Sequence, residues 1–208
     1  MKIWLNSDGK ATGGKKFFKV VQEVMIDKDG KPHNYANWVI LGCNANYLDY
    51  FDIGKFIEEL GEDYVLAIRL HPNYASYCDE EHPIDLKDLA NRYDIIDFTG
   101  FKDEQKLLLL SDIFITDYSS IMVDYTILNK PILLFAYDLD DYLKNERGFY
   151  FDYREKVPGK IVYDIDELIE SIKDEDFHME KLEEFSQFQF GDFKANASKS
   201  ILDHVLED

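Results

Sequence analysis

A set of residues suited to binding an anion follows a short apolar run, at Arg69-Leu-His-Pro72. An arginine offers a planar fork of N–H donors that matches phosphate oxygens, and a histidine is a donor whose charge changes near neutral pH. Arg69 and His71 together therefore suit a diphosphate. The alternative is that both side chains pair with carboxylates of an acidic protein, and the spacing alone favours neither interpretation.

A second candidate site is the segment Thr116-Asp-Tyr-Ser-Ser120. Small hydroxyl residues at a helix start expose backbone N–H groups to an anion and add hydroxyl donors. Ordinary helix capping explains one of Ser119 and Ser120 easily and both less well. Asp124 lies one helical turn after Ser120, where it could accept a hydrogen bond from a ribose hydroxyl. For an acid on a helix, however, simple exposure to solvent is the more common situation.

A third feature is the stretch from Tyr137 to Gly159, in which aromatic residues stand beside acids and an arginine. Its weak periodicity predicts a long functional loop over residues 136–160, with plain core contacts as the alternative. The five histidines show no metal-ligand spacing, and the chain has no Walker A, GxGxxG, HExxH or GxSxG motif. We therefore expect neither a metal site nor a cofactor.

The elements that position these residues follow from alternating apolar runs and amphipathic segments. The alternation predicts right-handed βαβ units, and hence an α/β fold with a doubly wound, Rossmann-like parallel sheet. In such sheets, ligands bind at the carboxyl ends of the strands, where the first two candidate sites lie. The predicted strands are 38–42, 64–70, 95–98, 113–116 and 131–135, and the predicted helices are 53–60, 85–92, 103–110, a segment starting at Ser119 or Ser120, 166–173 and 196–206.

Composition narrows the class of protein. The 208 residues include 23 basic and 42 acidic ones, a net charge of −19, with 46% hydrophobic residues, which is enough for a buried core. The acidity argues against nucleic acid as a partner and against docking on an anionic membrane. Two separated cysteines and the absence of a signal peptide or membrane span predict a cytoplasmic protein. We expect residues 1–36 to be an irregular leader or linker remnant, and residues 37–208 to be a nucleotide-binding domain.

The run Ser111-Asp-Ile-Phe-Ile-Thr-Asp-Tyr-Ser-Ser-Ile-Met-Val-Asp-Tyr125 resembles the CDP-glycerol glycerophosphotransferase family of wall teichoic acid synthesis. Pro131-Ile-Leu-Leu-Phe135, Arg147-Gly-Phe-Tyr-Phe-Asp152 and Val157-Pro-Gly159 follow in the family's order. The resemblance covers about residues 37–206. It implies the C-terminal, donor-binding half of an enzyme built like a GT-B glycosyltransferase.

The resemblance also implies ligands and residue roles. The donor would be CDP-glycerol or CDP-ribitol, the acceptor a polyol phosphate, and a second GT-B domain or chain would complete the enzyme, free in the cytoplasm or peripheral at the inner membrane face. A non-catalytic CDP-binding module and a fragment of a nucleotide-sugar glycosyltransferase are the alternatives. By the resemblance, Arg69 and His71 would lie at the diphosphate, and His71 would stabilise the departing CMP. Ser119 and Ser120 would bind phosphate oxygens. Thr116 and Asp117 would shape the turn, and Asp124 would reach the ribose.

Overall fold

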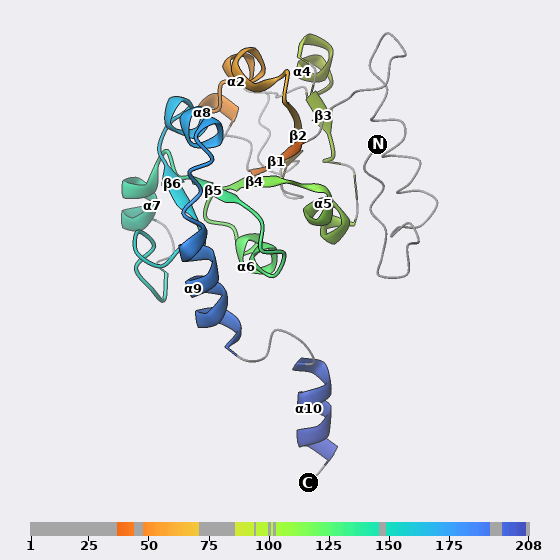
Figure 1. Cartoon of the computed structure of the whole chain (residues 1–208), viewed down its shortest axis with the longest axis vertical. Helices are drawn as coiled ribbons and strands as arrows, with labels where there is room; N and C mark the ends of the chain where they lie inside the picture. The colour runs from red at the N-terminus through yellow and green to blue at the C-terminus, as the bar shows by residue number, and fades with distance from the viewer. Residues whose placement is uncertain are drawn as a thin grey trace. The chain divides into compact units, whose positions relative to one another are not determined.

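The computed structural model describes residues 37–43, 48–70, 86–93, 95–99, 101, 103–145, 149–191 and 197–206, which alternate between strands and helices (Figure 1). The chain forms two compact units that divide between Ile113 and Phe114. The strands are β1 (Asn37–Cys43), β2 (Tyr64–Leu70), β3 (Ile95–Asp97), β4 (Ile113–Thr116), β5 (Ile132–Phe135) and β6 (Lys160–Val162). The helices are α2 (Ile53–Leu60), α4 (Leu86–Arg92), α5 (Glu104–Leu110), α6 (Ile121–Thr126), α7 (Leu139–Asn145), α8 (Ile165–Lys173), α9 (Met179–Phe190) and α10 (Ala197–Leu206).

The first unit contains a parallel sheet in which β2 lies between β1 and β3. The register places Gly42 of β1 opposite Arg69 of β2, and Leu66 of β2 opposite Ile95 of β3. Residues 65–68 are all buried, the nearly continuous apolar pattern of a parallel strand covered on both faces.

Local sequence sets the limits of α2, which packs on this unit. The Asp52 side chain caps its start by accepting a hydrogen bond from the Lys55 N–H at 2.9 Å. Gly61 ends it, with its N–H donating to the Ile57 carbonyl at 2.9 Å. The buried residues Ile53, Phe56 and Leu60 recur at helical spacing, so the helix predicted over 53–60 is confirmed.

The second unit contains a parallel sheet in which β5 lies between β4 and β6. All four residues of β5 are completely buried. Helix α6 follows β4 and packs against α9, and the Phe114 ring of β4 lies tilted against the buried ring of Tyr125, with 5.0 Å between centroids. The six described strands are thus parallel to their paired neighbours, and the predicted α/β class with parallel strands is confirmed.

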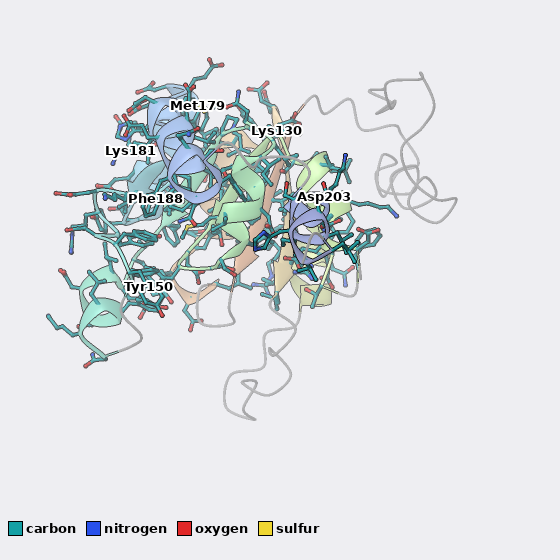
Figure 2. All side chains as sticks on the ribbon, turned by 90° about the horizontal axis from the view of Figure 1, so that it is seen from below. Lys130, Tyr150, Met179, Lys181, Phe188 and Asp203 are labelled. Carbon is teal, nitrogen blue, oxygen red and sulfur yellow. The ribbon has the colours of Figure 1, made fainter. Side chains whose placement is uncertain are left out.

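The prediction of a long loop over residues 136–160 is wrong in part, because α7 lies within it and β6 begins at its end. Helix α9 was not predicted at all. The helix starts after His178, which has a left-handed backbone conformation and whose side chain makes no capping hydrogen bond. Its only buried residues are Leu182, Phe185 and Ser186. Two further apolar residues of this helix, Met179 and Phe188, are 37% and 56% exposed (Figure 2). So narrow an apolar stripe is a weak helical signal.

The predicted leader, residues 1–36, lies outside the described residues. In the part of the chain that the structure describes, no helix combines the length and the apolar character needed to cross a bilayer.

The Val157-Pro-Gly159 motif has a packing reason at Gly159. A Cβ atom there would lie 2.3 Å from the Ile132 carbonyl oxygen of β5. We predict that Gly159→Ala lowers the free energy of unfolding by about 2 kcal/mol, because backbone atoms of a buried strand cannot move aside cheaply. Urea denaturation measures this.

The matched control is Gly54→Ala in α2, where a Cβ would meet mainly the Tyr93 side chain, at 3.1 Å. Alanine is the better helix former, so the control should unfold at the same or a higher urea concentration. Equal stability of Gly159→Ala and the wild type would contradict the close approach.

Candidate functional site

The turn after β4 is built around Asp117. Thr116 ends the strand fully buried, and the Asp117 side chain is also buried, with 9% of the residue exposed. One Asp117 carboxylate oxygen accepts a hydrogen bond from the Ser119 N–H at 3.2 Å. The carboxylate therefore stabilises the turn by accepting from a backbone N–H two residues later, a local contact that aspartate makes readily.

Two tyrosines fix this turn: Tyr118, which belongs to it, and Tyr153, which reaches it from a later loop. The buried Tyr153 hydroxyl donates to the Asp117 carbonyl oxygen at 3.0 Å. The Tyr118 hydroxyl donates to the Asp138 carboxylate at 2.6 Å, and the Tyr118 ring stacks on Tyr142 with 3.8 Å between centroids. Burial, and for Tyr118 also the hydrogen bond to Asp138, raises the pKa of both phenols, so they remain hydrogen-bond donors.

Burial also acts on the carboxyl group in the turn. It raises the pKa of Asp117 from 3.8 to about 6, although the hydrogen bond from the Ser119 N–H favours the charged form. Desolvation is the larger effect because the carboxylate has lost its water without gaining a cation. A fraction of the Asp117 side chains is then protonated just below neutral pH.

Ordinary helix capping does not account for the two serines. Ser120 occupies the N-cap position of α6 and makes no side-chain cap hydrogen bond. The Ser119 hydroxyl accepts a long hydrogen bond from the Ile121 N–H, at 3.5 Å. Ser120 is exposed and Ser119 is partly exposed, so neither hydroxyl is firmly engaged within the turn. Asp124 lies exposed on α6.

Arg69 belongs to the first unit, near the carboxyl end of β2. Its side chain is 15% exposed, and its Nη2 forms an ion pair at 3.0 Å with Glu104 Oε2. The alternative considered from sequence, an arginine paired with a carboxylate, is thus observed. His71 lies outside the described residues, so its role stays a prediction. The structure gathers Thr116, Asp117, Ser119 and Ser120 in one turn of the second unit, with Asp124 on the helix that follows.

Sequence reasoning missed Tyr118, Tyr153, Asp138 and Glu104. The sequence shows that the loop is rich in aromatic residues, but composition does not identify which rings contact the turn. The Phe149 ring centroid lies 4.7 Å from that of Tyr153 and 5.8 Å from that of Tyr142, so these aromatic residues form packing contacts around the turn. No pattern along the chain joins Arg69 to Glu104.

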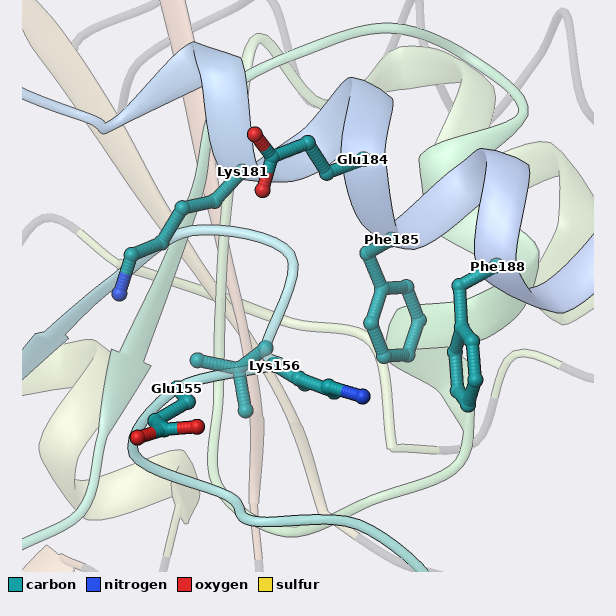
Figure 3. Close-up of a pocket in the computed structure, with 7 residues that line it drawn as sticks. Glu155, Lys156, Lys181, Glu184, Phe185 and Phe188 are labelled. Carbon is teal, nitrogen blue, oxygen red and sulfur yellow. The ribbon is translucent and has the colours of Figure 1, made fainter.

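A pocket of about 190 Å³ lies between the loop after Tyr153 and helix α9 (Figure 3). Val157, Phe185 and Phe188 supply its apolar lining, and Lys156 places its ammonium 5.2 Å from the Phe188 ring centroid. Residues 155–157 of this lining belong to the loop predicted over 136–160, whereas none of the described residues at the first two candidate sites lines the pocket. Within the described residues, no group of three or more His, Cys, Asp or Glu side chains could hold a metal ion.

Comparison with known proteins connects this chain to teichoic acid enzymes. The model of the family described as CDP-Glycerol:Poly(glycerophosphate) glycerophosphotransferase matches residues 42–207. The chain is 33% identical over 164 residues to a teichoic acid poly(ribitol-phosphate) polymerase of Bacillus spizizenii, covering 78% of this chain and 25% of that protein. It is 40% identical over 123 residues to a teichoic acid glycerol-phosphate transferase of Staphylococcus aureus, covering 59% of this chain and 29% of that protein.

The fold comparison agrees. The structure of a variant of the wall teichoic acid polymerase TagF, soaked with CDPG, matches with a TM-score of 0.65 and 31% identity over 92% of this chain and 45% of that one. This likeness confirms the predicted α/β class for the chain as a whole. The matched region thus spans between a quarter and about half of the length of these relatives.

The burial of Asp117 predicts a pH dependence of stability. Between about pH 4 and pH 6 the folded protein holds a proton on Asp117 that the unfolded chain has released, so the free energy of unfolding falls as pH rises through this window. Asp117→Asn removes the cost of the buried charge. We predict that the substitution stabilises more at pH 7 than at pH 4.5, by on the order of 2 kcal/mol, in urea denaturation.

Asp203→Asn in the exposed helix α10 is the control, since it also removes one acidic group. A stability difference between Asp117→Asn and the wild type that is the same at both pH values would contradict the raised pKa.

Proposed function

Because the chain belongs to the CDP-glycerol:poly(glycerophosphate) glycerophosphotransferase family, we propose that it is the donor-binding half of a teichoic acid glycerophosphotransferase, taking CDP-glycerol or CDP-ribitol. Its relatives include enzymes named for glycerol phosphate and for ribitol phosphate, so the family alone does not select the polyol. The observation that carries the proposal is the family match over residues 42–207, which includes the residues of both candidate sites.

The chemistry of the second unit supports a phosphate at the turn after β4. Ser119 and Ser120 bring two hydroxyl groups that the helix does not use as firm caps. The turn that carries them is fixed by the hydrogen bond from Tyr153 to Asp117. A fixed turn presents its donors without an ordering cost when the ligand arrives. In the proposed role, the two serines bind phosphate oxygens, Thr116 and Asp117 keep the shape of the turn, and Asp124 accepts a hydrogen bond from the ribose.

The proposed contribution of the first unit is a cation. Arg69 is the proposed partner of the diphosphate, and the proposed role of His71, two residues later in the sequence, is to stabilise the leaving group. In the proposed reaction, a hydroxyl oxygen of the polyol-phosphate acceptor forms a bond to the β-phosphorus as the bond to the bridging oxygen breaks. CMP leaves with the electron pair, and the hydroxyl proton passes to a base. Catalysis of this kind rests on positioning and on charge stabilisation at the phosphoryl group.

A second domain or chain is proposed to supply the base and the acceptor groove, since the relatives are at least twice as long as the region matched here. Helix α10 gives independent support. Its apolar residues Ile201, Leu202, Val205 and Leu206 are each more than half exposed, and a folded neighbour would bury them. Such an enzyme would act in the cytoplasm, where peripheral contact with the inner membrane face would bring it to its acceptor.

Two alternatives remain distinct from this function. A stand-alone module that binds CDP without catalysis would share the same donor site. A fragment of a nucleotide-sugar glycosyltransferase would share the fold and prefer another nucleotide, because architecture alone does not fix the substrate.

Calorimetric titration of the chain with CDP, UDP and GDP separates these functions. We expect CDP to bind most tightly. Absence of CDP binding, or a preference for UDP, would rule out the proposed function. If CDP binds, turnover of CDP-glycerol with a polyol-phosphate acceptor, tested with and without the remaining part of a longer relative, distinguishes the enzyme from the module.

The Ser119→Ala/Ser120→Ala double variant tests the site itself. Loss of two hydroxyl donors to a charged group should weaken CDP binding by about tenfold or more, while the thermal unfolding midpoint changes little. Ser198→Ala/Ser200→Ala in exposed α10 is the matched control and should bind CDP like the wild type. Unchanged affinity of the first double variant would reduce Ser119 and Ser120 to structural residues.

A further inference from the structure

The ion pair between Arg69 and Glu104 is a part of the first unit for which the donor-binding residues named so far give no reason. Arg69 is largely buried at 15% exposed, whereas Glu104 is 41% exposed. In the proposed function Arg69 binds the diphosphate, so a carboxylate 3.0 Å from its Nη2 is placed to set the direction of the guanidinium. The pair therefore calls for a functional explanation.

Both partners stand on fixed backbone. Near Arg69, the Leu70 N–H donates to the Thr99 hydroxyl at 3.2 Å, and the Phe98 N–H donates to the Ile68 carbonyl at 2.8 Å, so the end of β2 is tied to the end of β3. Glu104 is the first residue of α5, whose position is set by the buried residues Leu107, Leu108 and Leu110 and by the Asp103 side chain, which accepts from the Lys106 N–H at 3.2 Å.

The contact uses only part of the guanidinium. Glu104 Oε2 engages Nη2, and among the described residues no acceptor reaches the buried Nε. A bidentate pair would occupy one full edge of the arginine fork. Glu104 instead holds the group through a single nitrogen, which fixes its direction and leaves other N–H donors uncommitted to the pair.

The Glu104 carboxylate is 41% exposed, so water screens it and the pair is weaker than a fully buried one, although the mostly buried guanidinium keeps it stronger than a surface pair. Such a pair does not lock the guanidinium away from a phosphate. It does restrict a side chain with four rotatable bonds, and this reduces the ordering that ligand binding would otherwise require. The effect expected of Glu104 is therefore preorganisation of Arg69 rather than competition with the ligand.

We propose that Glu104 is a positioning residue for the donor, holding the Arg69 guanidinium in the orientation that accepts the diphosphate; this rests on the proposed function. Glu104 itself does not touch the donor. The Gln side chain keeps an oxygen that can accept from Nη2, so Glu104→Gln retains the contact, whereas Glu104→Ala removes it.

The test is the affinity of the full chain for CDP and for CMP, measured by calorimetry. Glu104→Ala should weaken CDP binding by about tenfold, the cost of disturbing one charge-assisted contact, and should reduce the advantage of CDP over CMP. Glu104→Gln should restore CDP affinity to within about threefold of the wild type, because the oriented acceptor is retained. Gln105→Ala, at the exposed neighbouring position, is the matched control and should bind like the wild type.

A double-variant cycle separates positioning from a general structural role. Arg69→Ala should weaken CDP binding, and adding Glu104→Ala to it should cause no further loss, because the group to be positioned is gone. If Glu104→Ala does not fold, Glu104→Asp takes its place, because the shorter side chain moves the carboxylate away from Arg69 and weakens the ion pair while keeping the negative charge. A purely structural Glu104 would lower affinity for CDP and CMP alike and would still do so without Arg69.

These experiments distinguish failure of the proposed function from failure of the role proposed for Glu104. Wild-type protein that does not bind CDP overturns the proposed function and this inference with it. CDP binding that weakens in Arg69→Ala but is unchanged or tighter in Glu104→Ala overturns only the role of Glu104.

Discussion

The net charge of −19 is the constraint on which the proposed function depends, because the ligand is itself an anion. A diphosphate can bind such a chain only where the local field is less negative than the average. Two features work in that direction. Glu104 and Arg69 neutralise each other, and burial raises the pKa of Asp117 to about 6, so this carboxyl carries less than a full charge near that pH. The acidic surface elsewhere then disfavours anions at other places.

The conformation of the turn after β4 also depends on tyrosines from a distant part of the sequence, Tyr142 and Tyr153. The Tyr153 hydroxyl satisfies the carbonyl of Asp117, and Tyr118 is held by Asp138 and Tyr142. A buried carbonyl without a partner would be costly, so these hydrogen bonds stabilise one conformation of the turn. The aromatic residues of the loop, for which the sequence left a functional role and core contacts as alternatives, pack against Tyr118 of the turn and so support the candidate site.

The sequence allowed correct prediction of elements whose signals are local. Helix α2 has a capping aspartate, a terminal glycine and three apolar residues on one face, and β5 is a fully buried apolar run. Helix α9 was missed because its buried stripe is narrow and its first residue follows a left-handed backbone without a cap. The contacts of Tyr153 with Asp117 and of Arg69 with Glu104 were missed for a different reason. Tertiary packing creates them, and no short-range pattern encodes them.

The most direct test follows backbone amides and the arginine side-chain signal by nuclear magnetic resonance while the full chain is titrated with CDP. We predict saturable shifts that are largest at the Ser119 and Ser120 amides and at the Arg69 Nε–H, with one dissociation constant for all three. Shifts confined to the pocket at Lys156 and Phe188, or no saturable shift at any of the three groups, would contradict the proposed roles of these residues in donor binding.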